Sequence, residues 1–267
     1  MTITDQLNKK ITLPAWPPRR IVSLVPSQTE LLYDLGLDAE VVGITKFCIH
    51  PADWFQKKTR VGGTKTLNGP KIEALHPDLV IGNKEENDQN QVEALAARYP
   101  VWMSDVHNLE EAYDMIGRIG QLTGKEREAQ QLIGRIRAEF AERIPALRSN
   151  SRRPSVAYFI WRKPYMVAGG DTFIHDMLRI AGFDNVFASA GRYPEISLEE
   201  LSRTQPEVIL LSSEPYPFAP KHLDTFRETC PGARVQLVDG AMFSWYGSRL
   251  LHAGKYVQQL RESLNLV

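Results

Sequence analysis

The stretch Glu73-Ala74-Leu75-His76-Pro77-Asp78-Leu79-Val80-Ile81 decides the fold class of this chain. It reads as a helix end, then a proline that cannot continue the helix, then a β-branched run that suits a strand covered on both faces. The same order returns in Leu201-Ser202-Arg203-Thr204-Gln205-Pro206-Glu207-Val208-Ile209-Leu210, with the two prolines 129 positions apart. Because this spacing is about half of the 267 residues, the repeat predicts two similar lobes.

Short β-branched runs alternate with amphipathic helical stretches along the rest of the chain. We expect strands at 20–24, 41–44, 78–81, 101–103, 155–159, 185–187, 207–210 and 235–237. We expect helices near 28–36, 69–75, 87–98, 108–121, 172–182, 197–204, 219–228 and 247–264. This alternation is typical of parallel α/β architecture, so the predicted fold class is α/β, with a central parallel sheet in each of two Rossmann-like lobes.

A single long helix is predicted between the lobes, over the 23 residues Lys125–Leu147, about 35 Å in length. Its apolar residues fall on one face: Ala129, Leu132, Ile133, Ile136, Phe140 and Ile144. A polar linker follows at once, which favours a rigid strut over the alternative of a crossover helix in a single sheet. The predicted domains are an N-terminal lobe at 1–123, a backbone helix at 124–149 and a C-terminal lobe at 150–267.

Composition excludes several classes of protein. The chain has 32 basic and 32 acidic side chains, so it carries no overall charge for nucleic acid or an anionic membrane. No apolar run reaches the roughly 18 residues of a membrane span, and the first residues lack the apolar core of a secretory signal, so the expected location is cytoplasmic. Only Cys48 and Cys230 are present, which favours free thiols over a disulfide scaffold.

Enzyme motifs are scarce, since the sequence has no glycine-rich dinucleotide loop, P-loop, nucleophile elbow, C-x-x-C or H-E-x-x-H. Only Cys48-Ile49-His50 places two metal-ligating residue types close together, without the further pair that a closed zinc site requires. We therefore predict no catalytic residue and no metal site. Cys48 and His50 are expected to pack within a loop, and a two-ligand metal role is the alternative.

The loops that follow the strands are the best candidates for a binding site, because ligands of parallel α/β sheets lie beyond the carboxyl ends of the strands. A further loop precedes the last helix. The six loops are Pro26–Gln28, Thr45–His50, Asn83–Asn87, Trp161–Tyr165, Ser213–Phe218 and Phe243–Arg249.

The repeat also relates two acidic residues, since Glu85 and Glu214 each lie eight residues after a repeat proline. The two lobes are thus expected to present carboxylates symmetrically to a shared cleft. The alternative is that Glu85 and its neighbour Glu86 only favour a helix N-terminus through the helix dipole.

Aromatic residues in these loops have two interpretations as well. Trp161, Tyr165, Trp245 and Tyr246 are either ordinary core residues or a binding surface. Arg162, Lys163 and Arg249 are interleaved with them in loops punctuated by proline and glycine, which favours rigid rings and a few charges that hold a bulky ligand.

The chain resembles a known family, the helical-backbone substrate-binding proteins that deliver cobalamin, haem or ferric siderophores to ABC importers, among them the helical backbone metal receptors. The resemblance runs from about Arg20 to the C-terminus. It rests on four motifs: Arg20–Glu30 followed by Leu35-Gly36, Val41–Thr45, Val61-Gly62-Gly63-Thr64, and Ile72–Ile81. It implies two α/β lobes joined by one long helix, and no catalysis.

The likeness is greatest to the cobalamin-binding branch, with departures at particular positions. Lys65 and Asn83 stand where the periplasmic cobalamin binder has tryptophans, Trp245 replaces an arginine, and Ala181 replaces a disulfide cysteine. Family members dock on their permease through one glutamate per lobe. Glu199 matches the second of these, and the first falls on Pro70.

The leading hypothesis is a monomeric, non-catalytic protein that binds a metal chelate between its lobes, has no obligatory cofactor, and serves an ABC importer permease. The expected ligand residues are Pro26, Ser27, Phe47, Lys65, Asn83, Glu85, Glu86, Trp161, Arg162, Tyr165, Glu214, Trp245, Tyr246 and Arg249, with Glu199 as the docking residue. Two alternatives remain: a cytosolic enzyme of cobamide or siderophore chemistry that uses Glu85, Glu86, Cys48 or His50, and a cytosolic sensor that binds a protein through Glu199.

Overall fold

The structure is a computed structural model that describes residues 1–148 and 152–266. The chain divides into two compact units. The first comprises Met1–Val106, Glu110–Ile136 and Tyr246–Arg249. The second comprises His107–Leu109, Arg137–Trp245 and Leu250–Val267. A short segment from near the C-terminus therefore belongs to the first unit, although its sequence neighbours on both sides belong to the second.

A five-stranded parallel sheet forms the centre of the first unit, in the order β5-β4-β3-β6-β7. Its strands are β3 (Ile21–Ser23), β4 (Val41–Ile44), β5 (Thr59–Arg60), β6 (Leu79–Asn83) and β7 (Val101–Ser104). The run predicted as a strand at 78–81 forms β6, which lies between β3 and β7 and is buried along its whole length. Burial of both faces explains its nearly continuous apolar sequence.

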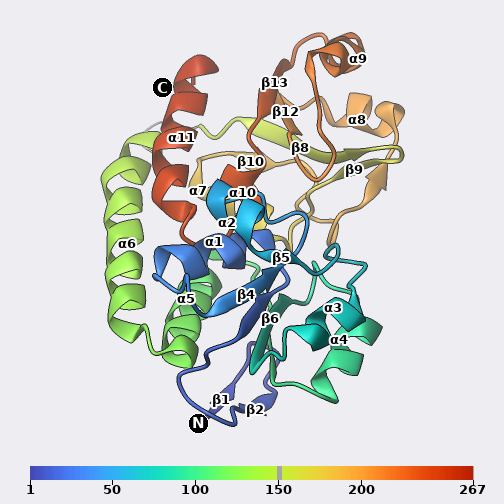
Figure 1. The fold of residues 1–267 in the computed structure, drawn as a ribbon. Helices are drawn as coiled ribbons and strands as arrows, with labels where there is room; N and C mark the ends of the chain where they lie inside the picture. Colours follow the sequence, from blue (N-terminus) through green and yellow to red (C-terminus); the bar gives the residue numbers. More distant parts are fainter. Residues whose placement is uncertain (149–151, 267) are drawn as a thin grey trace. The chain divides into compact units, whose positions relative to one another are not determined.

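Helices cover both faces of this sheet. They are α1 (Pro26–Asp34), α2 (Ala52–Lys57), α3 (Gly69–Ala74), α4 (Gln89–Ala96) and α5 (Leu109–Thr123). Helices α3 and α4 lie on one side of β4 and β6 in Figure 1, and α1 and α5 lie on the other. Ile72 of α3 and Leu95 of α4 pack with Val22 and Val80 of the sheet in one core cluster.

A β-hairpin that the sequence analysis did not predict opens the chain, formed by β1 (Thr2–Thr4) and β2 (Lys10–Thr12). Asp5 closes its turn, because its Oδ1 accepts hydrogen bonds from the backbone N–H groups of Leu7 and Lys9 at 3.0 and 2.7 Å. The next residue, Gln6, donates to the Glu111 carbonyl of α5 at 3.0 Å and so attaches the hairpin to the first unit.

The second unit contains a sheet in the order β11-β9-β8-β12-β13, with β10 also paired to β8. Its strands are β8 (Ser155–Arg162), β9 (Tyr165–Val167), β10 (Asp184–Asn185), β11 (Glu195–Ile196), β12 (Val208–Ser212) and β13 (Arg234–Val238). Strands β8, β10, β12 and β13 are parallel, as predicted, whereas β9 and β11 add an antiparallel edge that was not predicted.

The helices of the second unit follow the predicted order. They are α7 (Phe173–Ile180), α8 (Leu198–Thr204), a 3₁₀ turn at Pro220–His222, α9 (Leu223–Thr229), α10 (Ala241–Ser244) and α11 (Leu250–Ser263). Leu201 of α8 and Phe226 of α9 pack with Ala157, Phe159 and Ile209 of the sheet. The sheet thus has its own apolar core, as an independent lobe requires.

The internal repeat predicted from the sequence is present in the backbone. Asn68 and Ser197, 129 positions apart, are the N-caps of α3 and α8, and each accepts a hydrogen bond from the backbone N–H three residues on. His76 and Gln205, again 129 apart, both take a left-handed conformation with φ of 45° before the repeat proline. Strands β6 and β12 then begin at equivalent positions.

Helix α6 spans Glu126–Arg148, close to the predicted Lys125–Leu147. The six apolar residues predicted for one face are all buried: Ala129, Leu132, Ile133, Ile136, Phe140 and Ile144. The helix belongs to the first unit through Ile136 and to the second from Arg137. Because each unit has its own sheet, the alternative of a crossover helix in a single sheet is wrong. The domain boundaries at 124 and 149 stay a prediction.

Candidate functional site

The loop after β4 exposes an aromatic ring at the carboxyl edge of the first sheet. Phe47 is 51% exposed and its neighbour Ile49 is 52% exposed. The loop is anchored from inside, because the Sγ atom of Cys48 lies 3.1 Å from the hydroxyl oxygens of both Thr29 and Thr45. Lys46 adds a positive charge, with its Nζ 5.1 Å from the centre of the Phe47 ring. The loop therefore offers apolar and cationic contact area on a fixed backbone.

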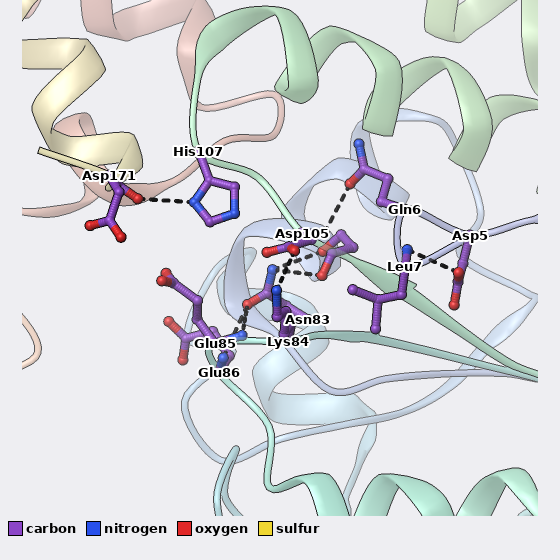
Figure 2. A network of polar contacts seen from close by, with 11 residues as sticks. Asp5, Gln6, Leu7, Asn83, Lys84, Glu85, Glu86, Asp105, His107 and Asp171 are labelled. Atoms are coloured by element: carbon purple, nitrogen blue, oxygen red, sulfur yellow. Dashed lines mark hydrogen bonds and ion pairs between the residues drawn. The ribbon is translucent and has the colours of Figure 1, made fainter. Parts of the chain in front are cut away.

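The loop after β6 is shaped by a buried amide. Asn83 is 1% exposed, and its Oδ1 accepts hydrogen bonds from the backbone N–H groups of Glu85 and Glu86 at 2.8 and 3.0 Å. Its Nδ2 donates to the carbonyl and hydroxyl of Ser104 at 3.2 and 3.0 Å. The Asn83 side chain thus makes its hydrogen bonds inside the protein, and these bonds hold the loop in place. Figure 2 shows the carboxylates of Glu85 and Glu86 on the same side of that loop.

A second buried amide supports the same loop. The Nδ2 of Asn87 donates to the Thr64 carbonyl at 3.0 Å, and its Oδ1 accepts from the Asn83 N–H at 2.8 Å. Lys65, which is exposed, directs its ammonium to the Glu85 carbonyl. The structure therefore brings together three of the predicted ligand residues, Lys65, Glu85 and Glu86, at the end of β6.

Pro26 and Ser27 begin α1 directly after β3. Pro26 is half-buried and Ser27 is 3% exposed. A Cβ atom on Gly247 would lie 2.6 Å from the Ser27 carbonyl oxygen, so the segment Tyr246–Arg249 packs closely over this helix start. The Ser27 side chain is therefore buried within the first unit.

Arg249 makes an ion pair within the first unit. Its Nε and Nη2 donate to the two carboxylate oxygens of Glu30 on α1 at 2.9 and 2.6 Å. The two side chains are only 14% and 16% exposed. Desolvation raises the pKa of Glu30, and the Arg249 charge opposes that rise. Arg249 was predicted to contact a ligand, whereas its pairing with Glu30 was not predicted.

The β8–β9 turn carries the aromatic and cationic residues of the second unit. Trp161 is 38% exposed, and its ring meets Tyr216 edge to face with 5.8 Å between centroids. Arg162 pairs with Tyr165 in the antiparallel register of β8 and β9. Tyr165 itself is half-buried and packs on Phe226 at 5.5 Å. Tyr216 lies in the predicted loop Ser213–Phe218 but was not among the predicted ligand residues.

Glu214 is held differently from its repeat partner Glu85. One of its carboxylate oxygens, Oε1, accepts hydrogen bonds from the Ser244 hydroxyl and from Trp245 Nε1, both at 2.7 Å. Trp245 is 7% exposed and Tyr246 is 6% exposed, which matches the alternative interpretation of core aromatics. The Glu214 carboxylate therefore has an internal role in the second unit that symmetry with Glu85 does not predict.

The predicted docking residue Glu199 lies on the surface, in the first turn of α8. Its carboxylate is 75% exposed and pairs with Arg203 one turn later. Pro70 occupies the equivalent position in the first turn of α3. The two repeat helices thus differ in charge at the same point of the fold.

Of the residues proposed for an enzyme, Cys48 is poorly suited to act as a nucleophile. Burial raises the pKa of the Cys48 thiol, which disfavours the thiolate that a nucleophile requires. Within 1–148 and 152–266, no three His, Cys, Asp or Glu side chains are arranged to hold a metal ion. Over the same described ranges, no helix has the length and apolar composition needed to cross a bilayer.

Comparison with known proteins assigns the family. The model of the periplasmic binding protein family matches residues 21–232, which is most of the chain. This chain belongs to the periplasmic binding protein family. It is 28% identical over 274 residues, 99% of this chain and 85% of the relative, to the uncharacterized ABC transporter substrate-binding lipoprotein YvrC of Bacillus subtilis. It is also 28% identical to the vitamin B12-binding protein of Yersinia pestis, over 76% of this chain and 72% of that protein.

The solved structures show the same two-lobed α/β fold. The periplasmic heme-binding protein RhuT from Roseiflexus aligns with a TM-score of 0.78 and 24% identity, covering 92% of this chain and 97% of that one. Family membership confirms that the chain is a substrate-binding protein of the ABC importer type and not an enzyme. The expected cytoplasmic location is wrong, because these relatives are lipoproteins or periplasmic proteins.

Proposed function

We propose that this chain binds a metal chelate of the corrinoid, haem or ferric siderophore class and delivers it to an ABC importer permease. The observation that carries the proposal is the placement of exposed apolar residues at the strand ends. Phe47 and Ile49 follow β4, and Trp161 is the second-last residue of β8, although most large apolar side chains of the described chain are buried. Exposed rings at the carboxyl ends of parallel strands are suited to a flat, bulky ligand.

Each unit also carries charged residues at its strand ends that suit the polar groups of such a ligand. In the first unit Lys65 supplies a cation, and Glu85 and Glu86 supply hydrogen-bond acceptors. In the second unit Arg162 supplies a cation beside Trp161. Relatives support the ligand class, since the Yersinia protein is named for vitamin B12 and the Roseiflexus structure for heme.

Isothermal titration with cobalamin, haemin and a ferric hydroxamate tests the proposal. Phe47→Ala and Trp161→Ala should each weaken binding of the preferred chelate by about 10- to 100-fold, because each removes the burial of a large ring. Matched controls are Tyr33→Ala and Trp16→Ala, which truncate rings that are 41% and 46% exposed away from the strand ends. Absence of saturable binding of every chelate, or equal losses in sites and controls, would contradict the proposal.

Delivery requires a docking surface, and Glu199 is the proposed contact for the permease. Its exposed carboxylate in the first turn of α8 can pair with a basic residue on the partner. Glu199→Lys should abolish stimulation of ATP hydrolysis by the reconstituted transporter, while Glu228→Lys, a charge reversal on exposed α9, should not. Equal activity of the two variants would exclude Glu199 as the docking residue.

A further inference from the structure

Arg162 differs from the other predicted ligand cations in what holds it. Hydrogen bonds to the phenols of Tyr216 and Tyr165 raise the pKa of Arg162. Within the described ranges 1–148 and 152–266 no ion pair joins Arg162 to a carboxylate, whereas Arg249 is bound to Glu30. Neutral phenol oxygens orient the guanidinium without cancelling its charge. Its positive charge therefore remains available to an anion.

Tyr216 is fixed in place on several sides. Its backbone N–H donates to the Ile160 carbonyl of β8 at 3.2 Å. Its ring packs edge to face on Phe218, with centroids 4.9 Å apart, as it does on Trp161. Its hydroxyl oxygen lies 3.4 Å from Nε2 of the buried His222. The phenol group is thus positioned by the protein before any ligand arrives.

The His222 ring determines which way the Tyr216 hydroxyl can donate. The Ala219 backbone N–H donates to His222 Nδ1 at 2.9 Å, so in the neutral ring the hydrogen is on Nε2. Desolvation lowers the pKa of His222 and keeps it neutral. Nε2–H then donates to the Tyr216 oxygen, which also accepts from Arg162. Because its oxygen already accepts, the Tyr216 O–H is left to donate to a ligand.

We infer that Arg162 and Tyr216 form a donor pair that recognises an oxyanion on the ligand of this protein. A guanidinium fork and an adjacent hydroxyl suit one planar carboxylate or one phosphate. Trp161, exposed beside them, offers a ring face for the flat part of the same molecule. The inference rests on the proposed function and adds a specificity: the chelate carries an anionic group that must lie against this pair.

Two chelate classes supply such a group in different forms. Haem bears carboxylates, and cobalamin bears a phosphodiester that cobinamide lacks. Binding is therefore measured for haemin against its dimethyl ester and for cobalamin against cobinamide, with wild type, Arg162→Gln and Tyr216→Phe. Each variant should lower the affinity for the anionic ligand by about 10- to 100-fold, which is the range expected for loss of a hydrogen bond to a charged group. The same variants should change the affinity for the counterpart that lacks the anionic group less than about 3-fold.

The matched control is Lys163→Gln, which removes an exposed positive charge one residue away. It should leave every affinity near the wild-type value, because binding depends on a charge held in place by the pair and not on the net charge of the protein. Arg162→Lys should recover only part of the loss, since an ammonium cannot form the planar fork.

Inorganic phosphate provides a probe that does not depend on the chelate. In the wild-type protein, phosphate titration should shift the side-chain NMR signal of Arg162 Nε–H, and Tyr216→Phe should weaken that shift. Equal losses for anionic and neutral ligands, or no phosphate response at Arg162, would overturn the inference while chelate binding stands. A phosphate response without binding of any chelate would instead contradict the proposed function alone.

Discussion

Arg249→Ala is expected to destabilise the protein by isolating a carboxylate that is largely shielded from solvent. Arg249 donates to both carboxylate oxygens of Glu30, at 2.9 and 2.6 Å, and both side chains are mostly shielded from solvent. Removing one partner of a shielded ion pair leaves an uncompensated charge, which costs far more than loss of an exposed pair. The free-energy cost therefore depends on whether Glu30 takes up a proton once Arg249 is removed.

The size of the penalty follows from the protonation of Glu30. Burial already raises the pKa of Glu30 above its ordinary value of 4.5, and without the guanidinium the carboxyl takes up a proton. Protonating a carboxyl with that ordinary pKa costs about 3.4 kcal/mol at pH 7 and about 0.7 kcal/mol at pH 5. We therefore expect a loss of about 2 to 3 kcal/mol at pH 7 and under about 1 kcal/mol at pH 5. A pKa that is higher in the folded state makes stability fall as the pH rises, which gives this sign.

Urea unfolding followed by circular dichroism at pH 5 and pH 7 measures both values. The matched control is Arg98→Ala in the same unit, because Arg98 also donates to both oxygens of one carboxylate, that of Glu73. That pair is 55% and 52% exposed, so its loss should destabilise the protein much less than Arg249→Ala does at pH 7, with little difference between the two pH values. Equal losses in the two variants, or a loss in Arg249→Ala that does not shrink at pH 5, would refute the reasoning.

Three further outcomes follow from the packing. Asn83→Ala should cost about 1 to 3 kcal/mol and speed amide exchange in the loop after β6, whereas Asn83→Asp keeps the acceptor and should slow that exchange again. Gly240→Ala should cost about 1 to 3 kcal/mol in urea unfolding, because its Cβ would approach the Ser212 hydroxyl oxygen in a packed core, while Gly134→Ala, with open space in helix α6, should stabilise by up to about 1 kcal/mol. Cys48 should react with a thiol reagent only after unfolding, since it is buried and its pKa is raised; modification of the native protein would contradict its placement.

The parallel strands and the helices between them could be predicted because their signals are local. Pro77 and Pro206 each end a helix and precede an apolar run, and the residue before each adopts the same left-handed conformation. The apolar face of α6 was predictable for the same reason, since residues three and four apart share one side of a helix. These patterns need no knowledge of the rest of the chain.

The elements that were not predicted are short and depend on partners. Strand β9 has three residues and β11 has two, too few to show a period of their own. They form strands because β8 extends to Arg162 and offers β9 an antiparallel edge, to which β11 then adds. Helices α2 and α10 were not predicted either, and they have only six and four residues.

The chemistry of the candidate site was visible in the sequence, but the availability of each side chain was not. Arg249 has the charge to meet an anion, yet its partner Glu30 is 219 positions away in the sequence. Trp245 and Trp161 are the same residue type in similar loops, and one is 7% and the other 38% exposed. Spacing says which residues lie at a strand end, whereas the neighbours brought in by folding determine which of them can meet a ligand.

The two repeat glutamates, Glu85 and Glu214, show which features the repeat predicts and which it does not. In each unit a polar side chain at the strand end accepts from the backbone N–H of the glutamate two residues on, at 2.8 Å from Glu85 to Asn83 and at 3.3 Å from Glu214 to Ser212. The repeat therefore does fix the backbone of both residues. The Glu214 carboxylate is then bound by a segment outside the repeated stretch, through Trp245 and its neighbour. An internal repeat thus predicts equivalent positions, while differences in function between its halves arise in the loops that the repeat does not include.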